Sequence, residues 1–460
     1  MLDKELLVKV LKKTRLYGGE YAEIFVERKK SASIQCEDKK IEKVITGVDA
    51  GFGIRLISNG RTSYAHSNDL SEASLLQAAS EVSKAATGAV TDLVIDLRAQ
   101  IPSVSFHINR FPEDVPVEKK ISIVRKADSA ARSYDKRIRQ VSVVYHDFIQ
   151  EVQIATTEGI VAEDKRVHTV AVIQVVAADG GLIQTGYESI GGFIGFELFD
   201  EINVEELSMK TAKRALMMLT AMRAPGGRMP AVISSEAGGT MIHEAIGHGL
   251  EADLAQQGLS VYSGKVGQSV ASPLISVIDD PTLQKKRGSF RFDDEGTHSQ
   301  RSVLVEKGIL KNYMYDKLTA MKDGVTSTGN GRRQSYQHRP IPRMTNTFIT
   351  PGDTPPGKII SSVDNGLFVK KMGGGQVNTV TGDFVFDVQE GYRIKHGMIE
   401  EPVRGATLAG NGPEILKSVD MVGSDLGFAI GTCGKDSQGV PVSDAMPTIR
   451  IPDIVVGGEI

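Results

Sequence analysis

The sequence predicts an α+β fold in two domains, the first with helices packed on an antiparallel sheet and the second rich in β-structure. Two observations lead to this prediction. Helical and strand patterns in the first half are joined by hairpin-type turns rather than by regular βαβ spacing. Glycine makes up 48 of the 460 residues, and 32 of these glycines follow residue 230. Such density is typical of tight turns and of closely approaching backbone.

Composition excludes several classes of protein. Lys and Arg number 54 against 57 Asp and Glu, so the net charge of −3 gives no reason to expect a nucleic-acid partner. No apolar run approaches the ~18 residues that a membrane span needs. The first residues form an amphipathic pattern without the apolar stretch of a signal peptide. The two cysteines, Cys36 and Cys433, cannot make a disulfide scaffold, and we therefore expect a cytoplasmic protein in a reducing compartment.

The first half is expected to begin with an amphipathic helix and to continue as short antiparallel strands with three further helices. Asn59-Gly60 is a strong hairpin signal between two of the strands. The expected helices span residues 1–13, 71–86, 117–134 and 204–222. The expected strands span residues 21–28, 32–35, 41–46, 51–57, 62–66, 141–148, 149–156 and 160–177.

The sequence predicts a domain boundary near residue 224. Residues 224–230 (APGGRMP) contain two prolines and two glycines, which is typical of a linker. The glycine content rises at the same point. We therefore divide the chain into an N-terminal α+β domain, residues 1–223, and a C-terminal domain, residues 224–460, which begins with a short strand at 231–234.

The second domain contains the string His243-Glu244-x-x-x-His248. Zinc-protease helices carry their histidine pair four residues apart, on one face. Five residues correspond to about 140° around a regular helix, so one metal ion could not bind both imidazoles. A π-bulge would return them to one face. The spacing therefore predicts an irregular helix at residues 245–249, where Gly247 and Gly249 would permit the distortion.

Two imidazoles, one further ligand and a water would form an open zinc site. Glu244 would then be placed as the general base for the zinc-bound water. The alternative is that both histidines are ordinary helix residues. Residue types leave the third ligand open between Glu251, one turn further on, and Cys433, which lies between glycines; Asp253 is a further candidate. Cys36 is expected to be structural.

Other polar groups are weaker candidates. Asp293-Asp294-Glu295 would suit a second cation, but such a run is more often a solvated face or a hydrogen-bonded loop. A donor to the reaction's oxyanion is expected, and the sequence does not choose among its candidates. These candidates are Tyr336, His338, Arg332 and His298.

Seven ordered segments across the second half together resemble the TldD/PmbA family. They are MIHEAIGHGLEAD (241–253), RFDDEGT (291–297), TGNGRRQSY (328–336), PRMTNTF (342–348), GGGQVNTVTGDFVF (373–386), VRGATLAGNG (403–412) and GTCGKDSQGVPV (431–442). Residues 49–65 match more loosely. The His-Glu-x-x-x-His motif is the mark of TldD-type subunits, because PmbA subunits, also called TldE, lack it.

The resemblance implies a zinc metalloprotease that acts on short or unfolded peptides held in an extended conformation. It places the metal ligands at His243, His248 and Cys433, with one zinc ion per active subunit, and the catalytic base at Glu244. It further implies a dimer, either of this chain with itself or with a PmbA/TldE-type subunit. No substrate-binding residue can be named.

Two rival functions are a non-catalytic peptide-binding or assembly subunit, with a structural metal or none, and a cyclase or transferase. Glu244 argues against the first, because a structural zinc site needs no carboxylate beside its ligand.

Overall fold

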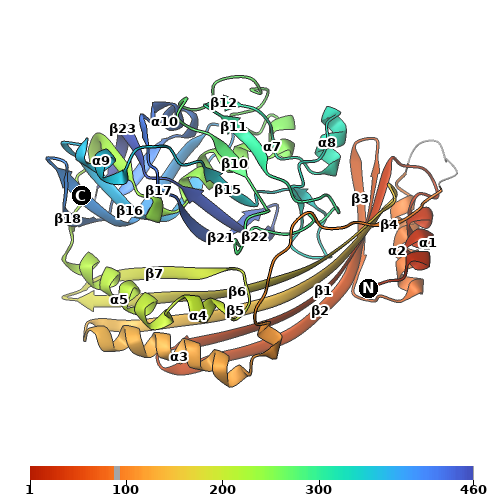
Figure 1. The fold of residues 1–460 in the computed structure, drawn as a ribbon, viewed down its shortest axis with the longest axis horizontal. Coiled ribbons are helices and arrows are strands. Elements are labelled where there is room, and N and C mark those ends of the chain that lie inside the picture. Colours follow the sequence, from red (N-terminus) through yellow and green to blue (C-terminus); the bar gives the residue numbers. More distant parts are fainter. Residues whose placement is uncertain (87–93, 459–460) are drawn as a thin grey trace.

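The computed structural model describes residues 1–86 and 94–458 and has the expected α+β class. Figure 1 shows the first half as one long, curved sheet with helices on its outer side and the second half on its other side. Within the described residues, every helix is too short or too polar to span a bilayer.

The first sheet has seven strands in the order β3-β2-β1-β5-β6-β4, with β7 added beside β6. All neighbours are antiparallel except β4 and β6. Asn59 and Gly60 form the turn between β2 and β3, as predicted, and both have positive φ. The strands are β1 (Tyr21–Glu37), β2 (Lys40–Ser58), β3 (Arg61–Ser67), β4 (Arg98–Ala99), β5 (Ile138–Thr156), β6 (Ile160–Asp179) and β7 (Leu182–Phe193).

The strands are longer than predicted. Residues 29–31 and 47–50 were expected to interrupt two runs, because they are polar or rich in small residues, but β1 and β2 continue through them. β1 pairs with β2 on one side and with β5 on the other. Main-chain hydrogen bonds on both edges of β1, and on the β1 edge of residues 47–50 in β2, hold the chain extended whatever its side chains prefer. The two short strands expected at 141–156 are likewise one strand, β5.

Two groups of helices cover the outer face of the sheet. The first group packs on Ile24, Phe52 and neighbouring residues, and the second packs on a core that includes Tyr145 and the buried Cys36. Asp3, Ser71 and Asn203 cap α1, α2 and α5 by accepting hydrogen bonds from backbone N–H groups. The helices of the first half are α1 (Lys4–Thr14), α2 (Glu72–Ser83), the short η1 (Pro112–Asp114), α3 (Val117–Tyr134), α4 (Leu198–Glu201) and α5 (Val204–Thr220).

The second half is β-rich and contains two larger sheets around one hydrophobic core. One has the order β12-β11-β10-β15-β22-β21, and the other has the order β16-β9-β23-β19-β17-β18-β8 with β20 beside β23. β13 and β14 form a separate pair. The strands are β8 (Met222–Arg223), β9 (Gly227–Ile233), β10 (Val277–Asp279), β11 (Ser302–Glu306), β12 (Ile309–Leu310), β13 (Gly331–Arg332), β14 (Ile341–Pro342), β15 (Asn346–Ile349), β16 (Asn365–Val377), β17 (Asp383–Lys395), β18 (Met398–Arg404), β19 (Thr407–Asn411), β20 (Met421–Val422), β21 (Gly427–Lys435), β22 (Gln438–Met446) and β23 (Ile449–Gly457).

Short helical segments connect these strands. The segment with the His-Glu-x-x-x-His string lies between the two sheets, because it contacts β22 of one and β16 and β17 of the other. Residues 227–230, which were expected in a linker, begin strand β9 instead. The predicted domain boundary at 223/224 stays a prediction. The helical segments are η2 (Ser235–Ala237), α6 (Thr240–Ile242), η3 (His243–Gly247), η4 (His248–Leu250), α7 (Ala252–Gln256), α8 (Lys317–Asp323), α9 (Pro356–Ser361) and α10 (Gly412–Ser418).

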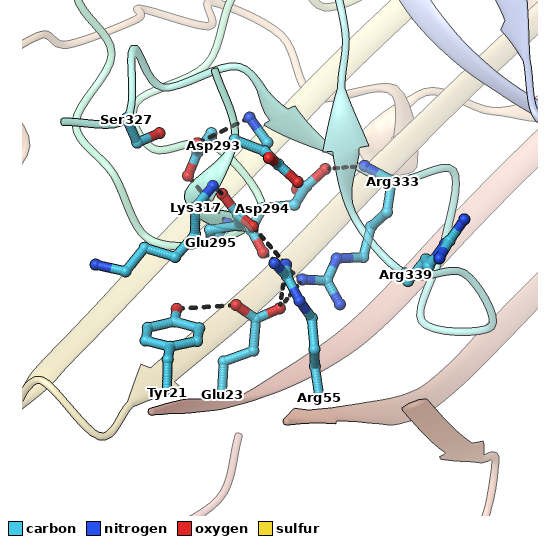
Figure 2. Close-up of polar contacts among 12 residues, drawn as sticks. Tyr21, Glu23, Arg55, Asp293, Asp294, Glu295, Lys317, Ser327, Arg333 and Arg339 are labelled. Atoms are coloured by element: carbon cyan, nitrogen blue, oxygen red, sulfur yellow. Dashed lines mark hydrogen bonds and ion pairs between the residues drawn. The ribbon is translucent and has the colours of Figure 1, made fainter. Parts of the chain in front are cut away.

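A buried set of ion pairs joins the two halves of the chain (Figure 2). Arg55 of β2 pairs with Glu295, and Glu23 of β1 pairs with Arg333. Arg166 of β6 pairs with Asp294 at 2.7 Å. These side chains are almost fully buried, so their mutual pairing compensates the cost of removing charge from water. The network fixes how the second half sits on the sheet.

Candidate metal centre

The helix that carries the two histidines is irregular, as the spacing predicts. Residues His243–Gly247 form a π-turn, and the His248 N–H donates to the His243 carbonyl, five residues back. A regular helical turn precedes it and a 3₁₀ turn follows it. The distortion begins two residues earlier than expected. In a regular helix the two histidines would point about 140° apart, and the π-turn instead places both imidazoles on one side.

Gly247 and Gly249 serve this segment by leaving space. Gly247 has φ −56° and ψ −58°, which any residue adopts. A Cβ on Gly247 would lie 2.2 Å from Met344 Sδ, and one on Gly249 would lie 2.6 Å from Tyr262 Cδ2. The Tyr262 hydroxyl donates to the Ala245 carbonyl of the π-turn at 3.0 Å. The two glycines are therefore needed because they let Met344 and Tyr262 pack directly against the turn. They are not needed for unusual backbone angles.

Strand β21 brings Cys433 to the two histidines. One donor atom from each of His243, His248 and Cys433 lies within 4.8 Å of the other two. Cys433 Sγ is 3.5 Å from His248 Nε2. The two imidazole rings are nearly perpendicular, with centroids 4.8 Å apart. In the part of the chain that the structure describes, this is the one cluster of three such side chains with metal-binding spacing.

Two buried carboxylates orient the imidazoles from behind. His243 Nδ1 lies 2.8 Å from Asp444 Oδ1, and His248 Nδ1 lies 2.9 Å from Glu251 Oε2. With Nδ1 donating to the carboxylate, each ring directs the Nε2 lone pair towards the cluster. Glu251 therefore supports a ligand instead of joining the cluster. Asp253 lies beyond it and pairs with Lys435 at 2.6 Å.

The ionisation of Cys433 favours metal binding, whereas a metal ion must displace a proton from His248. Burial raises the pKa of the Cys433 thiol, but contacts with His243 and His248 outweigh burial and lower that pKa to about 5. Burial lowers the pKa of His248, whereas Glu251 and Cys433 raise it to a net value of about 10. The thiolate is the form of cysteine that binds metal ions.

Glu244 faces the same space as the cluster. The cavity has a volume of about 320 Å³ and is lined by Glu244, the two histidines, Cys433, Thr379 and Lys435, among others. Burial raises the pKa of Glu244, although both histidines oppose the rise. Its side chain makes no hydrogen bond to any residue that the structure describes, so the carboxylate is free to act on a molecule in the cavity.

This set of groups fits a zinc ion. Imidazole nitrogen and thiolate are both ligands that zinc takes in proteins, and three protein ligands leave a fourth position open. The carboxylate behind each imidazole is the outer contact that metal-binding histidines usually have. The residues are held by a π-turn, an edge strand and buried hydrogen bonds, so the site is preorganised.

The remaining candidates lie elsewhere. Tyr336, His338, Arg332 and His298 do not line the cavity beside Glu244. Asp293, Asp294 and Glu295 are 1–3% exposed, so this run is not a solvated face. Asp293 accepts hydrogen bonds from the backbone N–H groups of Glu295, Thr297 and Gly331, which matches the other expectation, a hydrogen-bonded loop. Asp294 and Glu295 pair with Arg166 and Arg55 across the two halves. Burial raises the pKa of Asp293 to about 7.

Asp444 is the site residue that sequence reasoning missed. It lies 201 residues from His243 and reaches it only because α6 packs on β22. Nothing in the neighbouring sequence marks it.

Comparison with known proteins covers nearly the whole chain. Three models of the PmbA/TldA metallopeptidase match: domain 1 over residues 22–86, the central domain over 110–219 and the C-terminal domain over 226–458. A "Metalloprotease TldD homolog" of Haemophilus influenzae is 37% identical over 448 residues, which is 95% of this chain and 93% of the relative. A "Zinc metalloprotease TldD homolog" of Saccharolobus solfataricus is 28% identical over 458 residues, covering 99% and 100%.

Two solved structures share the fold. A Thermotoga maritima protein, described as a candidate modulator of a DNA gyrase, aligns with a TM-score of 0.80 at 22% identity and covers 99% of this chain and 100% of its own. TldE from Thermococcus kodakarensis aligns with a TM-score of 0.79 at 18% identity, covering 99% of both chains.

Proposed function

The chain belongs to the PmbA/TldD metallopeptidase family, and we propose that it hydrolyses peptide bonds in short or unfolded peptides with one bound zinc ion. His243, His248 and Cys433 would hold the ion, and Glu244 would be the catalytic base. The observation that carries the proposal is the convergence of these four side chains on one cavity. A purely structural metal site would not need a free carboxylate in the same space.

The chain's own residues account for the proton transfers. A bound zinc ion would polarise the scissile carbonyl and acidify the attacking water. Glu244 accepts the proton of that water and passes it to the leaving nitrogen. Its raised pKa suits both steps, because a base that must also return the proton works best with a pKa nearer to neutrality. Asp444 and Glu251 keep the imidazoles in place.

The strand that carries Cys433 supports a preference for extended peptides. β21 is at the edge of its sheet and pairs with β22 on one side only. An extended peptide could add to the free edge through main-chain hydrogen bonds, which do not depend on sequence. Such binding would admit short or unfolded chains and exclude folded ones.

We further propose that the chain acts as a dimer, with itself or with a TldE-type subunit. The support is the shared fold with TldE over 99% of both chains. Mixing the purified chain with a TldE-type subunit from the same cell, followed by native mass spectrometry, should give a one-to-one complex. Monomers alone in both samples would contradict the proposal.

Zinc content and peptide cleavage, measured on the same preparations, test the function. The wild-type protein and Glu244→Gln should each contain about one zinc ion per chain. Only the wild type should cleave an unstructured peptide. Glu236→Gln is the matched control, because Glu236 is more than half exposed and pairs with Lys210 at 3.6 Å, away from the metal cavity. Equal cleavage by the wild type and Glu244→Gln, or a zinc-free wild type, would refute the mechanism.

A further inference from the structure

A second cavity lies on the other side of the strand that carries Cys433. Its volume is about 300 Å³, and it separates the first sheet from the hairpin of β21 and β22. Lys29, Phe148 and His168 line it from the sheet; Arg287, Arg332 and Thr432 line it from the second half. Thr432 also lines the metal cavity, so the two cavities share a wall.

The cavity contains excess positive charge. Arg166 and Arg333 also line it, but Asp294 and Glu23 neutralise them. Lys29, Arg287 and Arg332 form no ion pair with any carboxylate among residues 1–86 and 94–458. Five cationic side chains but a single carboxylate, Asp294, are among the lining residues, so the cavity has a net positive charge.

Neutral groups hold two of these cations in place. Arg287 Nε donates to the Gly431 carbonyl at 3.1 Å, and its Nη2 donates to Thr432 Oγ1 at 3.3 Å. Arg332 donates to the carbonyls of Met344 and Pro441 at 2.6 and 2.7 Å. Carbonyl contacts fix the direction of a guanidinium but leave its charge uncancelled. Arg332 is only 6% exposed, so water screens it poorly.

The electrostatic cost of this arrangement is visible in the ionisation of its members. Burial lowers the pKa of Arg287 and of Arg332 to about 10 each. Burial also lowers the pKa of Lys29; Glu27 opposes this shift, and the charge of Arg287 adds to it. An anion bound between these groups would offset the cost of burying their charges.

His168 adds an unused hydrogen-bonding group. It is 3% exposed, and its Nδ1 has no partner among the described residues. Its ring stacks on Phe148 with centroids 4.5 Å apart. Burial lowers its pKa well below the usual value, so the imidazole is neutral and carries one N–H. A buried polar atom without a partner is uncommon in proteins, and it suits a site that a ligand completes.

We infer that this cavity binds the C-terminal carboxylate of a peptide that lies across the metal centre. The three cations would take the carboxylate, and Phe148 and Phe290 offer apolar walls for the last side chain. The shared wall at Thr432, the residue before Cys433, places this site next to the proposed cleavage site. The position of the peptide across the metal centre rests on the proposed function. The preference of the cavity for an anion does not.

Binding of matched peptides tests the inference without cleavage. We would use the zinc-loaded, full-length Glu244→Gln protein and a labelled, unstructured peptide with neutral side chains, as free acid and as C-terminal amide. Anisotropy should show the acid binding about tenfold or more tightly than the amide, since a hydrogen bond to a charged group contributes that much. Mass spectrometry would show that the peptide stays intact. Equal binding of acid and amide would overturn the inference.

Variants on one strand locate the effect. Lys29→Gln should lower the preference for the acid severalfold, because it removes one of the three cations, and Lys29→Arg should restore it. Lys30→Gln is the matched control, because Lys30 is the next residue on β1 and pairs with Glu113 at 2.6 Å outside the cavity. Zinc content and melting temperature of each variant would show that the metal centre and the fold persist. Retention of the preference in Lys29→Gln would refute the assignment.

Inorganic phosphate distinguishes a peptide terminus from a small free anion. Phosphate should compete with the free acid and not with the amide. If phosphate binds in a Lys29-dependent way while both peptides bind equally, the cavity serves a small oxyanion, and the peptide assignment is wrong. Failure of the proposed function would appear separately, as absent cleavage by the wild type.

Discussion

At the scale of single residues, the metal centre depends on carboxylates as much as on its ligands. Asp444 and Glu251 each hold one imidazole by Nδ1. Glu251 is fully buried, and Lys435 at 3.1 Å balances its charge. Burial alone would raise the pKa of Glu251, but Lys435 and His248 reverse this and lower it to about 2. Glu251 is therefore ionised at neutral pH.

Glu251→Gln should weaken zinc binding by about 10- to 100-fold, because an amide orients His248 less firmly than a carboxylate. Competition with a chelator would measure the affinity. Asp253→Asn is the control, since Asp253 also pairs with Lys435 but does not touch either histidine. A similar loss in both variants would mean that the charge of the region matters rather than the contact with His248.

Residue patterns predict part of this centre. The spacing of His243 and His248 requires a helix irregularity, and the structure has one. The same patterns do not decide whether Glu251 or Cys433 is the third ligand. Cys433 lies 185 residues from His248, so their contact depends on where β21 lies in the fold. Asp444 is beyond prediction for the same reason: its position follows from the register of β22 against α6.

At the scale of elements, the π-turn is stabilised by its neighbours. Tyr262 packs against Gly249 and donates to the carbonyl of Ala245. Met344 fills the space beside Gly247. The local sequence predicts that the helix is distorted but not where the distortion starts, because these contacts select the position of the turn.

Gly249→Ala should push Tyr262 aside and loosen the π-turn. Overpacking of this kind costs about 1–3 kcal/mol, and zinc affinity should fall with the melting temperature. Gly374→Ala is the control, because nothing lies within 4 Å of the Cβ it would add. Unchanged zinc affinity in Gly249→Ala would show that the turn does not depend on this contact.

The long strands show a second limit of sequence patterns. Polar or small residues in the middle of β1 and β2 predict interruptions, since local propensity is all that a single sequence displays. In the structure, pairing across β1, β2 and β5 keeps these residues extended. One of them, Lys29 in the middle of β1, lines the cavity between the first sheet and the hairpin of β21 and β22.

At the scale of the whole molecule, the two halves depend on charge compensation across their contact. Arg55 and Glu295 come from different halves and are each about 1% exposed. Figure 2 shows Tyr21, Glu23 and Arg55 of the sheet directed at the loop of residues 293–295. The sequence shows the acidic run but cannot show the arginines that meet it, because these lie far away along the chain.

Arg55→Met should lower the free energy of unfolding by about 3–5 kcal/mol, because it leaves Glu295 buried without its partner. Urea unfolding followed by circular dichroism would measure the change. Arg228→Met removes an exposed arginine that pairs with Asp453 at 2.7 Å, and it should leave the midpoint unchanged. Equal midpoints for both variants would mean that the buried pairs do not hold the halves together.

The central claim is that two imidazoles and the Cys433 thiolate hold a zinc ion, and X-ray absorption at the zinc edge tests it most directly. The zinc-loaded wild type should show one sulfur at about 2.3 Å and nitrogen or oxygen neighbours at about 2.0–2.1 Å. The sulfur signal should vanish in Cys433→Ser and persist in Cys36→Ser, since Cys36 lies in the core of the first half. A wild-type spectrum without sulfur, or a sulfur signal that survives in Cys433→Ser, would contradict the account.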